Sequence, residues 1–180
     1  MILICYDGSP DSRAAINSAG QLMAGETATV LTVWEPFLDI LTRTGAGMAY
    51  WPEGIDLEEI DAAAEQSARA SADEGVEHAR RAGLNPQPRT RARGATIAET
   101  ILSEADEAKA NAIVLGTRGL TGLKSLMLGS VSHAVVQHAD RPVIIVPSPE
   151  ITASAPPVGA ERSAAHQHGP GRGWQCPITY

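Results

Sequence analysis

The sequence predicts an α/β fold: a single domain with an open, parallel, five-stranded sheet and helices on both faces. Five short apolar runs alternate with longer stretches of helical spacing. This alternation is typical of a parallel sheet whose connections cross over its faces. The first run, residues 2–6, is apolar without a polar alternation, as a strand covered on both faces is. The 180 residues suit one ordinary domain with some length to spare.

The first third of the chain predicts two strands and one helix. A strand over 2–6 leads to Ser9, a suitable N-cap, and to Pro10, which is tolerated at the first position of a helix. The run 27–34, TATVLTVW, is rich in β-branched residues and predicts the second strand. The proline and glycine residues of 35–55 predict a loop that is long for a compact domain.

The middle of the chain predicts two helices and an edge strand. Residues 56–82 form a helix with acidic residues in its first turns and arginines in its last, which complements the helix dipole. The strand over 87–93 places Arg89, Arg91 and Arg93 on one face, where they either form an anion site or discourage pairing at the sheet edge. The acidic chain favours the second interpretation. The last predicted elements are a helix over 96–108 that opens on a capping box, a strand over 111–115, a helix over 130–138 and a strand over 142–146.

Composition narrows the functional classes. A net charge of −7 argues against broad attraction to nucleic acid or to an anionic membrane. The two cysteines, Cys5 and Cys176, make no disulfide framework, and the opening residues resemble no signal peptide, so we expect a cytoplasmic protein. We divide the chain into a folded domain over 1–149 and a flexible C-terminal tail over 150–180, which is rich in Ala, Ser, Pro and Gly.

The stretch 116–130, GTRGLTGLKSLMLGS, holds four glycines between a predicted strand and a predicted helix. It is either a mobile connection or a phosphate cradle made of backbone N–H groups at a helix N-terminus. A Walker loop is excluded because Leu123 separates Gly122 from Lys124, and a dinucleotide-binding glycine fingerprint is absent.

The spacing Gly116-x2-Gly119-x9-Gly129-Ser130 resembles that of the universal stress protein family, whose ATP-binding members carry Gly-x2-Gly-x9-Gly-Ser/Thr. The resemblance extends from residue 1 to about residue 147. It implies an adenine nucleotide alpha-hydrolase-like fold with strand order 3-2-1-4-5. In such a sheet the order reverses between strands one and four, which is where open α/β sheets bind ligands.

The resemblance also implies a role for individual residues. Asp7, which by itself could equally cap the turn after the first strand, would bind the ribose hydroxyls. The backbone of Val33 would contact the adenine edge, and Leu115 would pack against the nucleoside. The expected phosphate-binding residues are Gly116, Arg118, Gly119, Gly129, Ser130, Val131 and Ser132.

These observations predict an ATP-binding stress-response regulator, with or without Mg²⁺, in which nucleotide occupancy changes loop order and the binding of an unknown protein partner. We expect a homodimer paired through Val143–Val146, an apolar edge strand. One alternative is an adenylating or ATP-hydrolysing enzyme of the ATP pyrophosphatase class, because residues 7–12, DGSPDS, loosely resemble the loop after the first strand of those enzymes. Another is a nucleotide-free dimerisation module. Phe37, Tyr50 and Trp51 either cover the adenine pocket, pack locally or face a partner.

Overall fold

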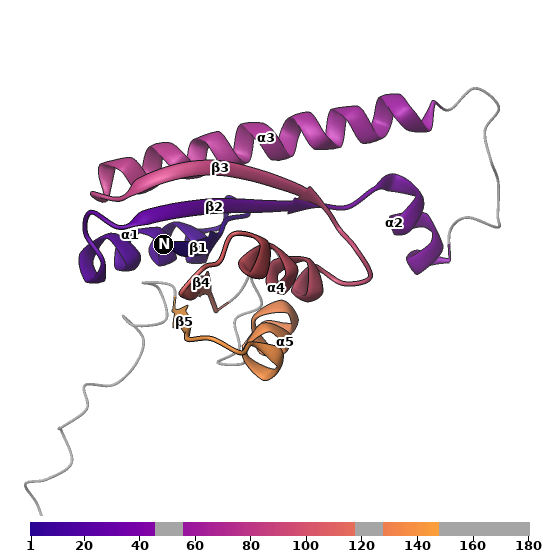
Figure 1. Ribbon diagram of the computed structural model, residues 1–180. Helices are drawn as coiled ribbons and strands as arrows, with labels where there is room; N and C mark the ends of the chain where they lie inside the picture. Colours follow the sequence, from indigo (N-terminus) through magenta and orange to yellow (C-terminus); the bar gives the residue numbers. More distant parts are fainter. Residues whose placement is uncertain (46–55, 118–127, 148–180) are drawn as a thin grey trace, which may run out of the picture.

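Five parallel strands form the sheet, in the order β3-β2-β1-β4-β5 (Figure 1). The central strand β1 pairs with β2 on one side and β4 on the other, so that Ile4 lies beside both Val30 and Val114. The strands are β1 (Ile2–Cys5), β2 (Thr27–Trp34), β3 (Asn85–Ala92), β4 (Ala112–Gly116) and β5 (Val143–Val146). The predicted fold class and strand order are confirmed.

The computed structural model describes residues 1–45, 56–117 and 128–147. The predicted tail over 150–180 lies outside these ranges, so the division of the chain into domain and tail remains a prediction. Arg118, Gly119, Tyr50 and Trp51 also lie outside the described residues. Within the described ranges, none of the helices combines the length and the apolar character needed to span a bilayer.

Helices cover both faces of the sheet (Figure 1). On one face, α1 (Pro10–Leu22) and α3 (Leu57–Arg81) bury a cluster that includes Ile4 and Val114. On the other, α4 (Ile97–Glu107) and α5 (Ser130–His138) bury Leu3 and Ile113. Neighbouring residues of β1 and of β4 thus point into opposite cores, which is why both strands are apolar throughout.

The helix starts agree with the sequence prediction. Ser9 is the N-cap of α1, and its hydroxyl oxygen accepts a hydrogen bond from the Ser12 amide at 3.2 Å. Thr96 caps α4 by accepting from the Glu99 amide at 3.0 Å. Each cap satisfies an amide that has no partner inside its helix, and so fixes where the chain turns away from the preceding strand or loop.

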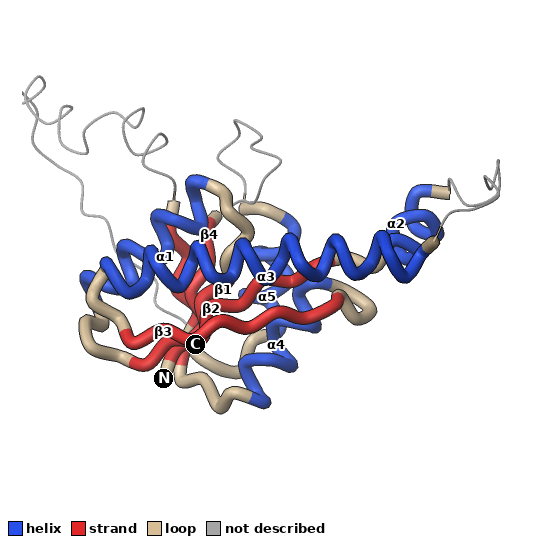
Figure 2. The backbone as a smooth tube through the Cα atoms, turned by 90° about the horizontal axis from the view of Figure 1, so that it is seen from above, coloured by secondary structure: helices blue, strands red, loops and turns tan. Residues whose placement is uncertain are grey.

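The segment after β2 contains a helix that the sequence analysis missed, α2 (Phe37–Thr44). Pro36 precedes it as the N-cap residue and Gly45, with a φ of 70°, ends it, so the proline and glycine that predicted a loop are the residues that bracket a helix. The Phe37 amide donates to Asp61 Oδ1 at 2.7 Å. Figure 2 shows α2 beside the N-terminal end of α3, away from the strands.

Strand β3 begins two residues before its predicted start, at Asn85 rather than at 87. The strand contains two prolines, Pro86 in the additional part and Pro88 within the predicted range. Strand β3 is at the edge of the sheet and pairs only with β2, so a residue without an N–H is tolerated there.

Candidate functional site

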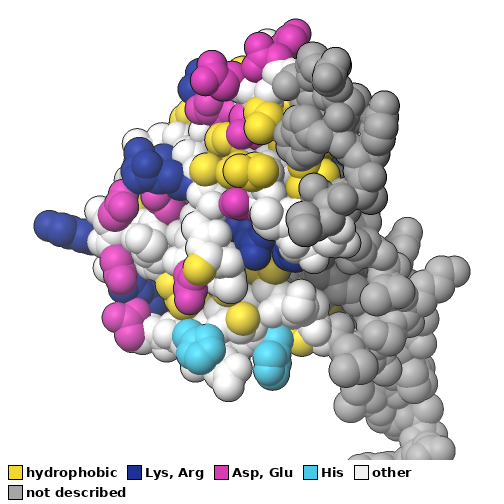
Figure 3. Space-filling model, turned by 90° about the vertical axis from the view of Figure 1, so that its right-hand side faces the viewer, with side chains coloured by type: hydrophobic (Ala, Val, Ile, Leu, Met, Phe, Trp, Pro, Cys, Tyr) yellow, Lys and Arg dark blue, Asp and Glu magenta, His cyan; other side chains and the backbone are white. Residues whose placement is uncertain are grey.

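The candidate site lies where the strand order reverses, between the carboxyl ends of β1 and β4. The chain leaves β1 toward β2 on one side and enters β4 on the other, and in open α/β sheets such a divergence marks the ligand-binding crevice beyond the strand ends. Asp7 follows β1 and Gly116 ends β4, so the fold brings these two predicted site residues to the same edge. Figure 3 views the molecule from the side toward which the strands run, and acidic and basic side chains are interspersed there.

Asp7 shapes the turn that joins β1 to α1. Its Oδ1 accepts from the Ser9 amide at 3.0 Å, and Gly8 between them has a φ of 78°, which glycine adopts without strain. Asp7 therefore caps the turn between β1 and α1. An ionised carboxylate can accept about four hydrogen bonds, so this one leaves capacity for ribose hydroxyls.

The thiol of Cys5 lies near Asp7 at the end of β1. Burial, and then the negative charge of Asp7, raise the pKa of Cys5 to about 12. The thiol therefore stays protonated at neutral pH, and Cys5 behaves as a small apolar residue that packs against the α4 and α5 core.

Tyr6 holds the end of β1 in place beside Asp7. It is 2% exposed, and its hydroxyl donates to Glu74 Oε1 of α3 at 2.9 Å, the same oxygen to which Arg13 of α1 donates. Burial, followed by the hydrogen bond to Glu74, raises the pKa of Tyr6. The contact joins β1, α1 and α3 directly before the candidate ribose-binding residue.

Val33 presents its backbone to the crevice. The Leu31 carbonyl accepts from the Tyr6 amide at 2.8 Å, whereas the Trp34 carbonyl accepts from the Arg93 amide beyond β3 at 2.7 Å. Because the backbone groups of successive residues in a parallel strand point to alternate sides, the N–H and C=O of Val33 point toward the β1 side. Strand β1 has ended at Cys5, so these groups face the space beyond it.

Gly116 is required by the packing of α1 against β4. A Cβ at this position would lie 2.6 Å from the Cβ of Asp11 and 2.8 Å from its carbonyl carbon. The sequence analysis explained this glycine by the approach of a phosphate, and the structure adds a reason that needs no ligand. Leu115, immediately before it, is 3% exposed and packs in the core with α4 and α5.

Thr117 and Asp11 are two residues of this region that the sequence analysis did not identify. The Thr117 hydroxyl donates to Asp11 Oδ2 at 2.7 Å, and Asp11 is 8% exposed. An acidic residue in the first turn of a helix is common, and nothing in the sequence distinguishes this buried one from a solvated one. The contact joins residues 106 positions apart.

The N-terminus of α5 has backbone donors without a side-chain cap. Gly129 is its N-cap residue and has no side chain to accept from these donors. The helical bonds begin with the His133 amide, which donates to the Gly129 carbonyl at 2.8 Å. The N–H groups of Ser130, Val131 and Ser132 therefore precede the first helical bond, and this positive end of the helix dipole suits an anion.

Two bonds fix this helix start to the end of β4. The Gly129 amide donates to the Thr117 carbonyl at 2.8 Å, and the buried Ser132 hydroxyl donates to the Gly116 carbonyl at 2.8 Å. The donors that an anion would meet are thus the three amides after Gly129 rather than that of Gly129 itself. The hydroxyl of Ser132 serves mainly to hold α5 against β4.

The arginine row of β3 does not join this site. Arg89 and Arg91 both pair with Glu104 and Glu107 of α4, and Arg93 pairs with Glu35 at 3.2 Å. The carboxylates neutralise the row, which argues against an anion site there.

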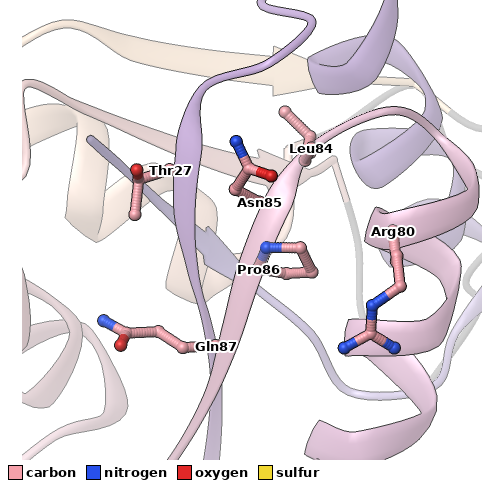
Figure 4. Close-up of a pocket in the computed structure, with 6 residues that line it drawn as sticks. All are labelled: Thr27, Arg80, Leu84, Asn85, Pro86 and Gln87. Atoms are coloured by element: carbon pink, nitrogen blue, oxygen red, sulfur yellow. The ribbon is translucent and has the colours of Figure 1, made fainter.

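Other features in the described parts of the chain give no second site. A hollow of about 430 Å³ lies at the amino ends of β2 and β3, opposite the crevice, and contains no predicted site residue (Figure 4). Within residues 1–45, 56–117 and 128–147, no group of three or more His, Cys, Asp or Glu could hold a metal ion.

Comparison with known proteins identifies relatives for most of the chain. A profile of the Universal stress protein family matches residues 1–147. The chain is 33% identical over 147 residues to the Universal stress protein YxiE of Bacillus subtilis (strain 168), covering 81% of this chain and 97% of that protein. It is 35% identical over 147 residues to a universal stress protein of Thermus aquaticus, covering 81% and 96%.

Solved structures share the fold at lower identity. The Universal stress protein UspA of Lactobacillus plantarum superposes with a TM-score of 0.59 at 24% identity, over 81% of this chain and 95% of that one. A universal stress protein of Archaeoglobus fulgidus in complex with dAMP gives 0.52 at 23%, over 81% and 95%. An Arabidopsis thaliana family protein with AMP bound gives 0.53 at 12%, over 81% and 90%.

Proposed function

The chain belongs to the universal stress protein family, and from this premise we propose that it binds ATP in the crevice between β1 and β4. The uncapped N-terminus of α5 carries the proposal. Three successive amides there lack helical acceptors, and a glycine N-cap has no side chain that would accept from them. Phosphate groups bind at helix N-termini of this kind because the amides point at the anion and the dipole favours negative charge.

The nucleoside part of the ligand finds complementary groups along the same edge. The backbone N–H and C=O of Val33 face the crevice and match the donor and acceptor pattern of an adenine edge. The carboxylate of Asp7, which accepts from Ser9 through Oδ1, has remaining lone pairs for ribose hydroxyls. Adenine, ribose and phosphate would thus follow the carboxyl ends of β2, β1 and β4 in turn.

The nucleotide complexes of structural neighbours support an adenine nucleotide as the ligand class. The solved neighbours include complexes with dAMP, with AMP and with cAMP. ATP adds two phosphates to this common part. Mg²⁺ usually binds through substrate phosphates and one or two carboxylates, so we propose that it enters with ATP and not through a dedicated protein site.

As a consequence of binding, we propose regulation in the cytoplasm rather than dedicated catalysis. Nucleotide held between Gly116 and Gly129 would order the chain between them and change the surface offered to a protein partner. We further propose a homodimer through the outer edge of β5 (Val143–Val146), because β5 is apolar and pairs only with β4 in the described sheet.

The binding proposal is tested by nucleotide-dependent thermal stability, since a ligand that binds only the folded state raises the melting temperature. Gly129→Val should abolish the shift produced by ATP, because a branched side chain would obstruct the α5 amides. Gly129 has φ −61° and ψ 154°, an extended conformation that valine adopts readily, so the variant should fold. Asp7→Ala should reduce the shift without abolishing it.

Ser103→Val is the matched control, since Ser103 is exposed on α4. A folded Gly129→Val protein with the full wild-type shift would contradict the proposed site. Mass spectrometry of nucleotide that co-purifies with the protein would identify the ligand, and release of pyrophosphate from ATP with candidate acceptors would favour the adenylating enzyme instead.

A further inference from the structure

We propose that Thr117 is a positioning residue of this site, whose hydroxyl bond to Asp11 sets the place of the phosphate-binding α5 amides relative to the ribose-binding carboxylate of Asp7. The inference rests on the proposed function and adds to it a determinant of binding that contacts no ligand. Neither residue belongs to the glycine pattern or to the set of site residues expected from the sequence.

Thr117 is the residue at which three elements meet. Its hydroxyl donates to Asp11 Oδ2 of α1 at 2.7 Å. Its carbonyl accepts from the Gly129 amide, at the start of α5, at 2.8 Å, and its amide donates to the Val146 carbonyl of β5 at 2.9 Å. A change in the position of Thr117 therefore moves the first turn of α5 with it.

The other end of this chain of bonds leads to Asp7. Asp11 lies in the first turn of α1, two residues after the N-cap Ser9, whose amide donates to Asp7 Oδ1 at 3.0 Å. The first turn of α1 thus connects the carboxylate assigned to ribose with the residue that holds the start of α5. The bond to Asp11 is charge-assisted and partly buried, with Asp11 itself 8% exposed, so it is stronger than an exposed bond between neutral groups.

The packing beside this bond leaves little room for another arrangement. Gly116 has no side chain because the backbone of Asp11 occupies the place of a Cβ. Threonine is β-branched and restricted at χ1, so a hydroxyl that is held by Asp11 selects one side-chain orientation. Without the bond, the main chain at 117 and the Gly129 amide that donates to it lose this restraint.

The two parts of the nucleotide should respond differently to loss of the bond. Adenosine would contact Val33, Asp7 and Leu115, whereas ATP also needs the α5 amides, whose hydrogen bonds weaken steeply with misalignment. A positioning role therefore lowers the affinity for ATP and leaves that for adenosine unchanged. A role in stability alone would lower the melting temperature and leave the ratio of the two affinities constant.

The experiment measures dissociation constants of ATP and adenosine by calorimetry on the full chain. Thr117→Val, which replaces the hydroxyl by a methyl group of similar size, should weaken ATP binding about tenfold, the effect of losing about one charge-assisted hydrogen bond between the α5 amides and phosphate, with adenosine changed by less than about twofold. Thr117→Ser, which keeps the hydroxyl, should remain within about threefold of wild type for both ligands.

A second pair of variants tests the same bond from the other side. Asp11→Ala and Asp11→Asn both remove the negative charge, but the amide oxygen of asparagine still accepts from Thr117. Asp11→Asn keeps an acceptor for the Thr117 hydroxyl and Asp11→Ala removes it, so ATP should bind more weakly to Asp11→Ala than to Asp11→Asn. If Thr117→Val does not fold, the two Asp11 variants still test whether the bond to Thr117 affects ATP binding.

Equal losses for ATP and adenosine, or no loss in Thr117→Val, would overturn the positioning role while leaving the proposed function intact. Equal ATP affinities of Asp11→Ala and Asp11→Asn would also overturn it. If the wild-type protein binds neither ligand, the proposed function itself fails and this inference falls with it.

Discussion

The sharpest prediction concerns Gly116→Ala in the protein without nucleotide. The added Cβ would lie 2.6 Å from the Cβ of Asp11, whereas an ordinary contact begins at 3.4 Å, so the neighbouring atoms must separate by 3.4 − 2.6 = 0.8 Å. Two of the three nearest atoms belong to the backbone of Asp11, at 2.8 and 2.9 Å. Because no rotation of a flexible side chain relieves such a contact, α1 has to move away from β4.

The expected cost combines two effects. Overpacking of a close contact costs about 1–3 kcal/mol. Moving α1 by this amount also lengthens the 2.7 Å bond between Thr117 and Asp11, and a lost hydrogen bond adds about 1 kcal/mol. We expect a loss of about 2–4 kcal/mol in the free energy of unfolding. For a chain of this size that corresponds to a fall of about 4–16 °C in melting temperature.

The assay is urea denaturation and calorimetry of the ligand-free protein. Gly94→Ala is the matched control, because the nearest atom to its added Cβ is Thr100 Oγ1 at 3.5 Å, an ordinary contact. The control should remain within about 0.5 kcal/mol of wild type. If Gly116→Ala is as stable as Gly94→Ala and loses only nucleotide binding, the glycine serves the ligand and not the packing of α1, and the reasoning here is refuted.

Three other predictions follow from the described contacts. Glu104→Ala should destabilise the protein by about 1–2 kcal/mol, since the Glu104 side chain is 4% exposed and pairs with two arginines of β3. Glu107→Ala should cost less than about 0.5 kcal/mol, because the Glu107 side chain is 54% exposed. Equal losses in urea denaturation would contradict this. The pKa of Cys5 is raised from 9.0 to about 12, so its contribution to stability is present below pH 9 and disappears as the pH rises toward 12. In a Cys176→Ser background, iodoacetamide should therefore alkylate Cys5 far more slowly at pH 9 than after unfolding, and equal rates would show a solvated thiol. Wild type should sediment as a dimer at micromolar concentration, and Ile145→Pro as a monomer. The Val146 carbonyl accepts from the Thr117 amide of the same chain, so the alternation of the strand turns the Ile145 N–H outward, where a partner strand would use it and proline has none. A monomeric wild type would rule the β5 interface out.

Sequence patterns predicted those elements whose cause is local. The bounds of β2, Thr27–Trp34, agree because a β-branched run specifies a buried strand, and α4 starts where its Thr96 cap predicts. The helix α2 was missed because Pro36 and Gly45 were interpreted as loop residues rather than as the two ends of a helix. The local signal was present, but its meaning depended on the apolar residues between them.

The site was predictable as a set of positions and not as a set of contacts. Asp7 and the α5 start follow from the spacing of the glycine pattern and from the strand order. The burial of Asp11, its bond to Thr117 and the exclusion of a Cβ at Gly116 depend on how closely α1 approaches β4. Such tertiary distances leave no trace in the spacing of one sequence.

The bond between the Gly129 amide and the Thr117 carbonyl, at 2.8 Å, also bears on how the connection between β4 and α5 can change in length. Because the fold itself holds the two ends together, a longer connection adds only the entropy of closing a longer loop. For a flexible loop closed in this way, doubling the number of residues costs only about 0.6 kcal/mol of additional closure entropy. A protein engineer could therefore place a peptide tag or a small sensor domain between these two residues, and the sheet beneath would still assemble.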